Sequence, residues 1–339
     1  MVFEEAVRPS TMSQKRVFIT GATGLLGANC VVEFLNQQFE VVAPVRKKSS
    51  FLLEDHPNLS IREGNLSDLE FLRETMQGCH YVVHAAAETQ QGLPKLADYW
   101  PSNVELTKNL LEIAVETQVL RFLHVSTSNV FGYGSMENPG IETTPIRPPF
   151  SESPYVQSKI MAQQCVFSFQ NEMEVITVHP TFLLGAYDQK PSSGRIIFHG
   201  WGKKIIFHPT GGKNFLNASD AAKSIFHLFT LGKNGESYLL SGENLSYRSF
   251  FKKFLLIQNQ KAWLLPIPQF LLILAGLMGT LFHRLGWKSE LSLANMRILG
   301  VKNYYSNRKV IHTTQLNFQP IEIGIQEALN WFKNTGRLP

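Results

Sequence analysis

The sequence predicts an α/β protein of the Rossmann type, a doubly wound parallel sheet with a smaller, discontinuous C-terminal substrate lobe. Three observations support this prediction. Buried apolar runs alternate with helix-compatible runs through the first half of the chain, a pattern that produces a parallel sheet with helices on both faces. A glycine-rich turn joins the first apolar run to the first helix. After about residue 185 the pattern becomes irregular, which indicates a second lobe.

The elements follow from these local patterns in chain order. Runs rich in β-branched and apolar residues predict strands at residues 16–20, 40–45, 59–63, 81–85, 122–126 and 175–179. Helices are expected between them at residues 28–37, 69–76, 104–116 and 155–170. Further along, a helix start is expected at residues 217–220 with Asp220 near its cap, a strand of either lobe at 236–240, and a helix at 246–256. Ligands of such sheets bind beyond the carboxyl ends of the strands.

The composition excludes several classes of function. The 339 residues are 44% hydrophobic and 17% charged, as in soluble globular proteins, and the net charge is +5. Lysines and arginines are dispersed, whereas a nucleic-acid surface clusters them, so we expect no nucleic acid partner. Cys30, Cys79 and Cys165 form no motif, and the histidines show no ligand spacing. We therefore expect reduced thiols, a cytoplasmic location and no metal site.

Three glycines follow the first expected strand in the spacing Gly21-x-x-Gly24-x-x-Gly27. Glycine is required where a backbone turns tightly or approaches a ligand closely. A helix that begins at such a turn directs unpaired N–H groups and the positive end of its dipole at the turn. This arrangement suits a dinucleotide diphosphate, although the glycines alone would also suit a simple tight turn.

Two further motifs contain side chains that can transfer protons. Tyr155 and Lys159 are four residues apart and share one face of an expected helix. A nearby cation favours a phenolate, so the tyrosine could exchange a proton with a carbonyl or alcohol oxygen. The strand at 122–126 ends in Ser126 and Thr127, whose hydroxyls could contact that oxygen. Each motif also has a structural interpretation, as a surface Tyr–Lys pair and as polar capping of a strand end.

Taken together and in order, residues 20–27, 126–132 and 155–159 resemble the extended short-chain dehydrogenase/reductase family, which is the NAD-dependent epimerase/dehydratase family. The resemblance covers roughly residues 15–335 and continues at 84–87, 103–110, 179–182, 214–222 and 235–245. Leu106 replaces a glycine of the family pattern and His179 replaces an arginine. Residues 43–46 and 180–185 look most like the dihydroflavonol-reductase branch.

The resemblance implies roles for individual residues. Tyr155 is the expected acid–base group, Lys159 is expected to hold the nicotinamide ribose and lower the tyrosine pKa, and Thr127 is expected to orient the reacting oxygen. The other residues expected to bind the cofactor through this resemblance are Gly21, Thr23, Gly24, Leu25, Leu26, Gly27, Asn65, Leu66, Ala85, Ala86, Ala87, Asn103, Ser126, Pro180 and Thr181. Asn65 stands where the family usually has Asp, and Asn103 could equally be a helix cap.

The end of the second expected strand indicates which dinucleotide binds. An acidic residue there would bind the ribose hydroxyls of NAD, but this strand is followed by Arg46 and Lys47. Because an arginine pairs well with a phosphate, we expect NADP rather than NAD, with Arg46 as the main contact and Lys47 as the second. A solvated basic loop is the alternative interpretation.

The resemblance implies an enzyme that transfers a hydride reversibly between NADPH and a ketone or aldehyde, often on a hydrophobic molecule. A nucleotide-sugar epimerase or dehydratase with the same Tyr155, Lys159 and Thr127 is the alternative. A non-catalytic NADP sensor is a third class. The resemblance also suggests a homodimer, and the sequence does not name the substrate.

We expect the chain to divide into a disordered leader at residues 1–13, an NADP-binding Rossmann domain at 14–184, and a mainly substrate-binding lobe at 185–339. Some segments of the lobe could return to the Rossmann domain. Residues 270–282 are strongly apolar but shorter than the ~20 residues that a membrane-spanning helix needs. A helix that is buried, or apolar on part of its surface, is the favoured interpretation, with a weak membrane contact or a wall for a lipophilic substrate as alternatives.

Overall fold

A computed structural model describes residues 15–90, 92–284 and 293–338, so the expected leader at 1–13 lies outside the described residues. Seven parallel strands form one sheet in the order β10-β6-β5-β4-β1-β2-β3. The strands are β1 (Arg16–Thr20), β2 (Glu40–Val45), β3 (Leu59–Glu63), β4 (Tyr81–His84), β5 (Arg121–Val125), β6 (Glu174–Pro180) and β10 (Glu236–Leu240). The predicted Rossmann-type sheet is confirmed, and residues 236–240 belong to it as the strand beside β6.

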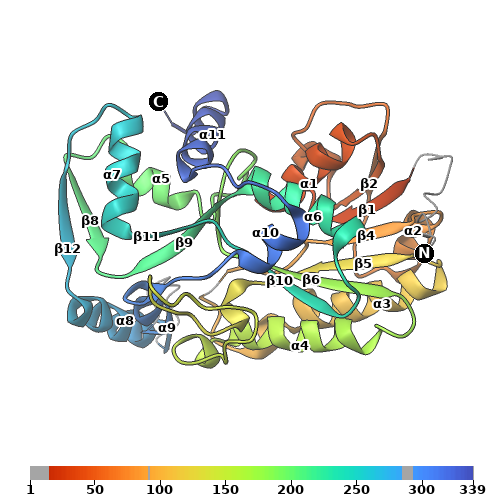
Figure 1. The fold of residues 1–339 in the computed structure, drawn as a ribbon, viewed down its shortest axis with the longest axis horizontal. Helices are drawn as coiled ribbons and strands as arrows, with labels where there is room; N and C mark the ends of the chain where they lie inside the picture. The colour runs from red at the N-terminus through yellow and green to blue at the C-terminus, as the bar shows by residue number, and fades with distance from the viewer. Residues whose placement is uncertain (1–14, 91, 285–292, 339) are drawn as a thin grey trace, which may run out of the picture.

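Helices cover both faces of the sheet (Figure 1). One face carries α1 (Leu25–Asn36), α6 (Ala218–Leu231) and α10 (Arg308–Thr314), and the other carries α2 (Leu69–Met76), α3 (Leu106–Glu116) and α4 (Pro154–Ser168). Each face has its own hydrophobic core, with Phe34 fully buried in the first and Phe122 in the second. The inner strands are therefore covered on both sides, which explains their largely apolar sequences, whereas the edge strand β3 is partly exposed.

The expected boundaries differ from the observed ones mainly where helices begin. α1 starts at Leu25, three residues earlier than expected, because Gly24 already has the extended conformation of an N-cap. A π-helical turn, η3 (Trp100–Glu105), precedes α3 and contains Asn103. The Asp220 carboxylate lies in the first turn of α6, as expected, and accepts hydrogen bonds from Asn217 Nδ2 (3.1 Å) and Gln319 N (2.7 Å).

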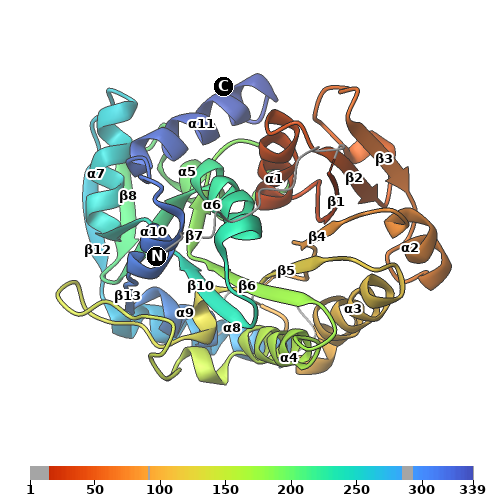
Figure 2. The same cartoon turned by 45° about the vertical axis from the view of Figure 1, so that its right-hand side comes forward.

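The remaining elements form a second lobe, on the left in Figures 1 and 2. Its strands are β7 (Phe182–Leu184), β8 (Ile205–Pro209), β9 (Gly212–Asn217), β11 (Glu243–Ser246), β12 (Trp263–Ile267) and β13 (Lys302–Asn303). Its helices are α5 (Arg195–Gly200), α7 (Tyr247–Ile257), α8 (Gln269–Arg284), α9 (Leu293–Leu299) and α11 (Ile321–Asn334). Strands β7, β11 and β13 all pair with β9, whereas β8 and β12 form a separate two-stranded ribbon. The division of the chain at residues 184 and 185 stays a prediction.

Short helical turns complete the chain between these elements. They are η1 (Lys48–Ser50), η2 (Leu96–Asp98), η4 (Ser128–Val130) and η5 (Phe150–Glu152). The turn η4 begins directly after β5, and the Thr127 side chain caps it by accepting a hydrogen bond from Asn129 N (3.3 Å). The expected polar strand end is therefore also the start of a turn.

Residues 270–282 lie in α8, which is buried on one face and exposed on another. Leu272 and Gly276 are buried, and Gly276 lies so close to α9 that a Cβ there would be 2.8 Å from Leu293 Cα. The exposed side chains of α8 are Phe270, Leu271, Leu274, Leu277 and Met278. α9 covers only one side of this helix, which leaves the other side open. Among the described residues, no helix combines the length and apolarity needed to cross a membrane.

Candidate active site

The loop between β1 and α1 leaves space for a bound group because its glycines lack side chains. Gly21 has a φ of +74°, and a Cβ there would lie 2.8 Å from backbone atoms of Ala85 and Ala86, just after β4. A Cβ on Gly27 would collide with the Gly21 carbonyl. No side chain caps α1, whose N-cap is Gly24, so the N–H groups of its first turn point into this loop. The loop therefore fits a dinucleotide diphosphate.

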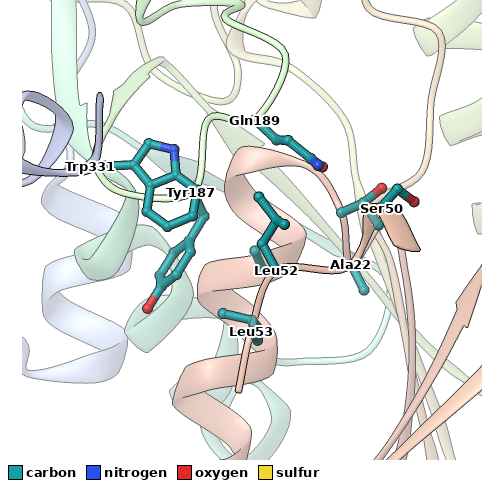
Figure 3. Close-up of a pocket in the computed structure, with 9 residues that line it drawn as sticks. Ala22, Ser50, Leu52, Leu53, Tyr187, Gln189 and Trp331 are labelled. Atoms are coloured by element: carbon teal, nitrogen blue, oxygen red, sulfur yellow. The ribbon is translucent and has the colours of Figure 1, made fainter. Parts of the chain in front are cut away.

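A pocket lies against this glycine loop, and Figure 3 shows most of its lining. The lining residues are Ala22, Thr23, Ala28, Ser50, Leu52, Leu53, Tyr187, Gln189 and Trp331. The rings of Trp331 and Tyr187 contact each other at one side, with centroids 4.9 Å apart and planes inclined by 56°, and Ser50 lies at the other side. Ser50 is part of η1, which follows the exposed residues Arg46 and Lys47 at the end of β2. The basic segment predicted to bind a phosphate is thus next to the pocket.

The structure brings Tyr155, Thr127 and Lys159 together at the carboxyl end of β5. Tyr155 lies in the first turn of α4 and its side chain is hydrogen-bonded to that of Thr127. One turn later, the buried Lys159 ammonium donates to the Val125 carbonyl at 2.8 Å. These contacts place a phenol, a hydroxyl and an amine side by side.

Burial dominates the protonation of this group. It raises the pKa of Tyr155 to about 12, although the hydrogen bond from Thr127 opposes the shift. Burial also lowers the pKa of Lys159 to about 7. The expected lowering of the tyrosine pKa by Lys159 is therefore not seen. The physical reason is that both groups are desolvated and that the Lys159 nitrogen is directed to the Val125 carbonyl.

Asn103 connects the loop after β4 to helix α4. Its Nδ2 donates to Ser158 Oγ at 2.9 Å and to the Glu88 carbonyl at 3.2 Å, while its Oδ1 accepts from Glu88 N at 2.8 Å. Ser158 Oγ in turn donates to the Tyr155 carbonyl at 2.7 Å. Asn103 therefore supports the position of Tyr155 rather than acting as a helix cap. Ser158 is a member of this site that we did not expect, although it lies between Tyr155 and Lys159 in the sequence.

Three buried histidines lie behind the site on β4, β5 and β6, and the sequence patterns did not single them out as a group. His84 lies between the hydroxyls of Thr20 (2.9 Å) and Thr107 (3.0 Å). His124 Nε2 lies 3.4 Å from the Lys159 ammonium, and His179 Nδ1 lies 3.2 Å from the Thr127 carbonyl. Burial lowers the pKa of all three, so they are neutral at neutral pH. Their signal in the sequence is a histidine at or near the carboxyl end of three successive expected strands.

The other predicted cofactor residues have different surroundings. Ser126 Oγ is buried with no hydrogen-bond partner within the part of the chain that the structure describes. Thr181 Oγ1, by contrast, donates to Asn214 Oδ1 at 2.7 Å and helps to hold β9. Asn65 Oδ1 accepts from Ser67 N at 3.0 Å, which forms the turn before α2. Thr23 lines the pocket, Leu25, Leu26 and Pro180 are buried, and Leu66 and Ala85, Ala86 and Ala87 are half-buried.

No group of three or more potential ligand side chains that could hold a metal ion occurs among residues 15–90, 92–284 and 293–338. The site is thus built from a glycine loop, hydroxyl groups, a phenol and an amine at the carboxyl ends of parallel strands. This is the construction of a dinucleotide-dependent enzyme.

Comparison with known proteins identifies the class. A family model described as the NAD dependent epimerase/dehydratase family matches residues 17–240, and the chain belongs to this family. The protein is therefore an enzyme of the NAD(P)-dependent extended short-chain dehydrogenase/reductase type, and its relatives include reductases, dehydrogenases and dehydratases.

The individual relatives share only about a quarter of their residues with this chain. A protein of Synechocystis sp., provisionally named dihydroflavonol 4-reductase, is 27% identical over 330 residues, which are 94% of this chain and 95% of the relative. The sterol-4-alpha-carboxylate 3-dehydrogenase (decarboxylating) of Dictyostelium discoideum is 26% identical over 268 residues, 75% of this chain and 81% of the relative. The crystal structure of gox2253 superposes with a TM-score of 0.80 at 24% identity, covering 96% of this chain and all (100%) of that one, and shows the same fold.

The depressed pKa of Lys159 predicts how stability depends on pH. Between about pH 7 and the ordinary lysine value of 10.5, the unfolded chain binds the Lys159 proton and the folded protein does not. The contribution of this lysine to the free energy of unfolding therefore rises with pH across that window. In Lys159→Met this rise should be missing.

The measurement is urea unfolding of the cofactor-free protein at several pH values from 7 to 10. The difference in unfolding free energy between wild type and Lys159→Met should grow in favour of wild type as the pH rises. Lys252→Met, at an exposed position of α7, controls for the loss of one positive charge. Parallel pH profiles for wild type and Lys159→Met would show that the amine is not buried as described.

Proposed function

We propose that the protein is an NADP-dependent oxidoreductase that transfers a hydride reversibly between NADPH and a ketone or aldehyde of a hydrophobic small molecule. The observation that carries this proposal is the grouping of Tyr155, Thr127 and Lys159 at the same carboxyl edge of the sheet as the glycine loop. A phenol hydrogen-bonded to a hydroxyl, one helical turn from an amine, can protonate a carbonyl oxygen.

The chain offers contacts for each part of the cofactor. The loop with Gly21, Gly24 and Gly27 would hold the diphosphate. Arg46 and Lys47 would hold the ribose phosphate of NADP, since both are exposed and Arg46 makes no ion pair within the described residues. The further contacts proposed from the resemblance are the side chains or backbones of Thr23, Leu25, Leu26, Asn65, Leu66, Ala85, Ala86, Ala87, Asn103, Ser126, Pro180 and Thr181.

When bound, the reduced nicotinamide supplies a hydride to the carbonyl carbon of the substrate. Tyr155 donates its phenolic proton to the carbonyl oxygen, which becomes the alcohol oxygen, and the Thr127 hydroxyl orients that oxygen by a hydrogen bond. The raised pKa of Tyr155 keeps the phenol protonated at neutral pH, as reduction requires. Lys159, one helical turn after Tyr155, would hold the nicotinamide ribose, which is the role that the resemblance gives it.

The surroundings of Tyr155 favour an apolar substrate. Its hydrophobic cluster includes Tyr99, Phe131, Ile298 and Tyr305, which come from both lobes, and the Tyr99 ring lies 5.8 Å from the Tyr155 ring. The names of two relatives, a dihydroflavonol reductase and a sterol dehydrogenase, indicate hydrophobic ring compounds as substrates in this part of the family. We therefore propose a fused-ring or aromatic ketone as the substrate class.

A nucleotide-sugar epimerase or dehydratase is the second candidate, and Lys213 is the observation that favours it. This half-buried lysine of β9 lies over the ring of Phe182 at 5.0 Å, and burial lowers its pKa to about 8. A cation held in this way in the substrate lobe could bind a diphosphate. A non-catalytic NADP sensor is the third candidate, and the presence of both Tyr155 and Lys159 speaks against it.

We also propose a cytoplasmic location, which the three free thiols Cys30, Cys79 and Cys165 support. A homodimer remains a proposal that rests on the family resemblance alone.

Replacing Tyr155 by Phe removes the proton donor and little else. We expect kcat for ketone reduction to fall roughly 100- to 10,000-fold, with the Kd for NADPH unchanged. Stopped-flow reduction and fluorescence titration measure the two quantities. Tyr133→Phe is the control, because its hydroxyl contacts the Pro148 carbonyl outside the site, and it should retain the parent rate. Turnover by Tyr155→Phe at the parent rate would exclude the proposed acid and favour the sensor.

Replacing Arg46 by Asp puts a carboxylate where the ribose phosphate would bind. The Kd for NADPH should rise roughly 10- to 100-fold, while the Kd for NADH stays within about twofold. Arg248→Asp in the second lobe is the matched control and should change neither value. An equal loss of affinity for both dinucleotides would contradict the phosphate contact.

A substrate panel separates the two enzymatic candidates. We expect aromatic and steroid ketones to cause stoichiometric oxidation of NADPH. The loss of NADPH absorbance measures this oxidation. Nucleotide sugars should cause no turnover. Sugar isomerisation or dehydration with the cofactor unconsumed, together with a loss of sugar binding in Lys213→Met, would establish the epimerase/dehydratase function instead.

A further inference from the structure

The outer face of the β8–β12 ribbon is apolar where a solvent-facing strand is normally polar. The strands pair in parallel, with Trp263 beside Ile205 and Leu265 beside Phe207. All four side chains are exposed, Trp263 by 76% and Phe207 by 52%. The alternate residue Ile206 is buried in the core of the lobe. The ribbon therefore has one face buried in the lobe and one apolar face exposed to solvent.

The ribbon leads directly into α8, whose exposed side is also apolar. Phe270, Leu271, Leu274, Leu277 and Met278 follow the spacing of one helical face, and α9 covers the opposite face. Figure 1 shows α7, β8, β12 and α8 grouped at the end of the molecule opposite β1 and β2. We call the exposed residues of β8, β12 and α8 together the apolar end.

The segments of the chain that form the apolar end carry only positive charges. No Asp or Glu occurs between Asp188 and Asp220 or between Glu243 and Glu290, the segments that contain β8, α7, β12 and α8. Lys203 and Lys204 immediately precede β8, and Lys261 precedes Trp263 on β12; all three lysines are exposed. Trp263 N donates to the Lys204 carbonyl at 2.9 Å, so the lysines border the exposed tryptophan.

We propose that the apolar end docks the protein on the surface of an anionic phospholipid membrane. Exposed Trp, Phe and Leu side chains bordered by lysines match the acyl boundary and the negative headgroups of such a surface. A two-fold contact with a second copy of this chain would instead bring the two lysine-bordered surfaces together. Lys203, Lys204 and Lys261 of one copy would then repel those of the other. The charge pattern therefore selects the membrane over self-association.

The test is co-sedimentation of the full-length protein with phosphatidylcholine vesicles, with and without phosphatidylglycerol. The wild type should sediment with the anionic vesicles, and high salt should weaken this binding. Trp263→Ser with Phe207→Ser should reduce the vesicle partition coefficient roughly 10- to 100-fold, because two large apolar side chains no longer insert. Lys203→Glu with Lys204→Glu should reduce binding to anionic vesicles roughly 10-fold or more.

The matched control is Leu120→Ser with Met136→Ser, which removes two exposed apolar side chains elsewhere and should bind like wild type. Circular dichroism melting of each variant confirms folding, since all the changed side chains are exposed. Absence of wild-type binding to anionic vesicles would overturn the proposal. Equal binding by the control and by the ribbon variant, which is Trp263→Ser with Phe207→Ser, would overturn it too. Light scattering that shows a dimer lost only in the ribbon variant would assign the apolar end to self-association and overturn it as well.

Discussion

The docking of α4 on the carboxyl end of β5 is the constraint on which the site depends. The Lys159 ammonium reaches across to the Val125 carbonyl, the Tyr155 side chain reaches Thr127, and Asn103 holds Ser158 from the loop after β4. These contacts come from the first two turns of the helix and involve two neighbouring strands. They fix both the position and the rotation of α4. The phenol and the amine therefore lie at the carboxyl ends of the strands, where the glycine loop also lies.

Low polarity sets the chemistry of this region. Burial raises the pKa of Tyr155, lowers that of Lys159 and keeps the histidines behind them neutral, so the site is assembled from uncharged or weakly charged groups. This low polarity supports the proposed carbonyl substrate on an apolar molecule, because burial of a charged group is costly. The apolar end of the second lobe extends the same preference to the outer surface. A protein held at a membrane would meet lipophilic substrates where they dissolve, which connects the two proposals without making either depend on the other.

The sheet could be predicted from sequence because its inner strands are buried on both faces and its glycine loop has one structural solution. The site could be predicted only in part. Tyr155, Lys159 and Thr127 could be predicted from spacing and resemblance. The contact between Asn103 and Ser158 could not, because it joins residues 55 positions apart and depends on a π-helical turn that sequence periodicity does not predict. Which face of α8 is exposed could not be predicted either, because an apolar sequence does not reveal which of its sides a neighbouring helix covers. The pKa directions follow from three-dimensional burial, which spacing does not contain.

The most direct measurement for this account is a crystal structure of the protein with NADP bound. The account predicts the diphosphate on the first turn of α1, the ribose phosphate beside Arg46, and the nicotinamide ribose within hydrogen-bond distance of Tyr155 and Lys159. A dinucleotide bound elsewhere, or a nicotinamide ring remote from Tyr155, would contradict it.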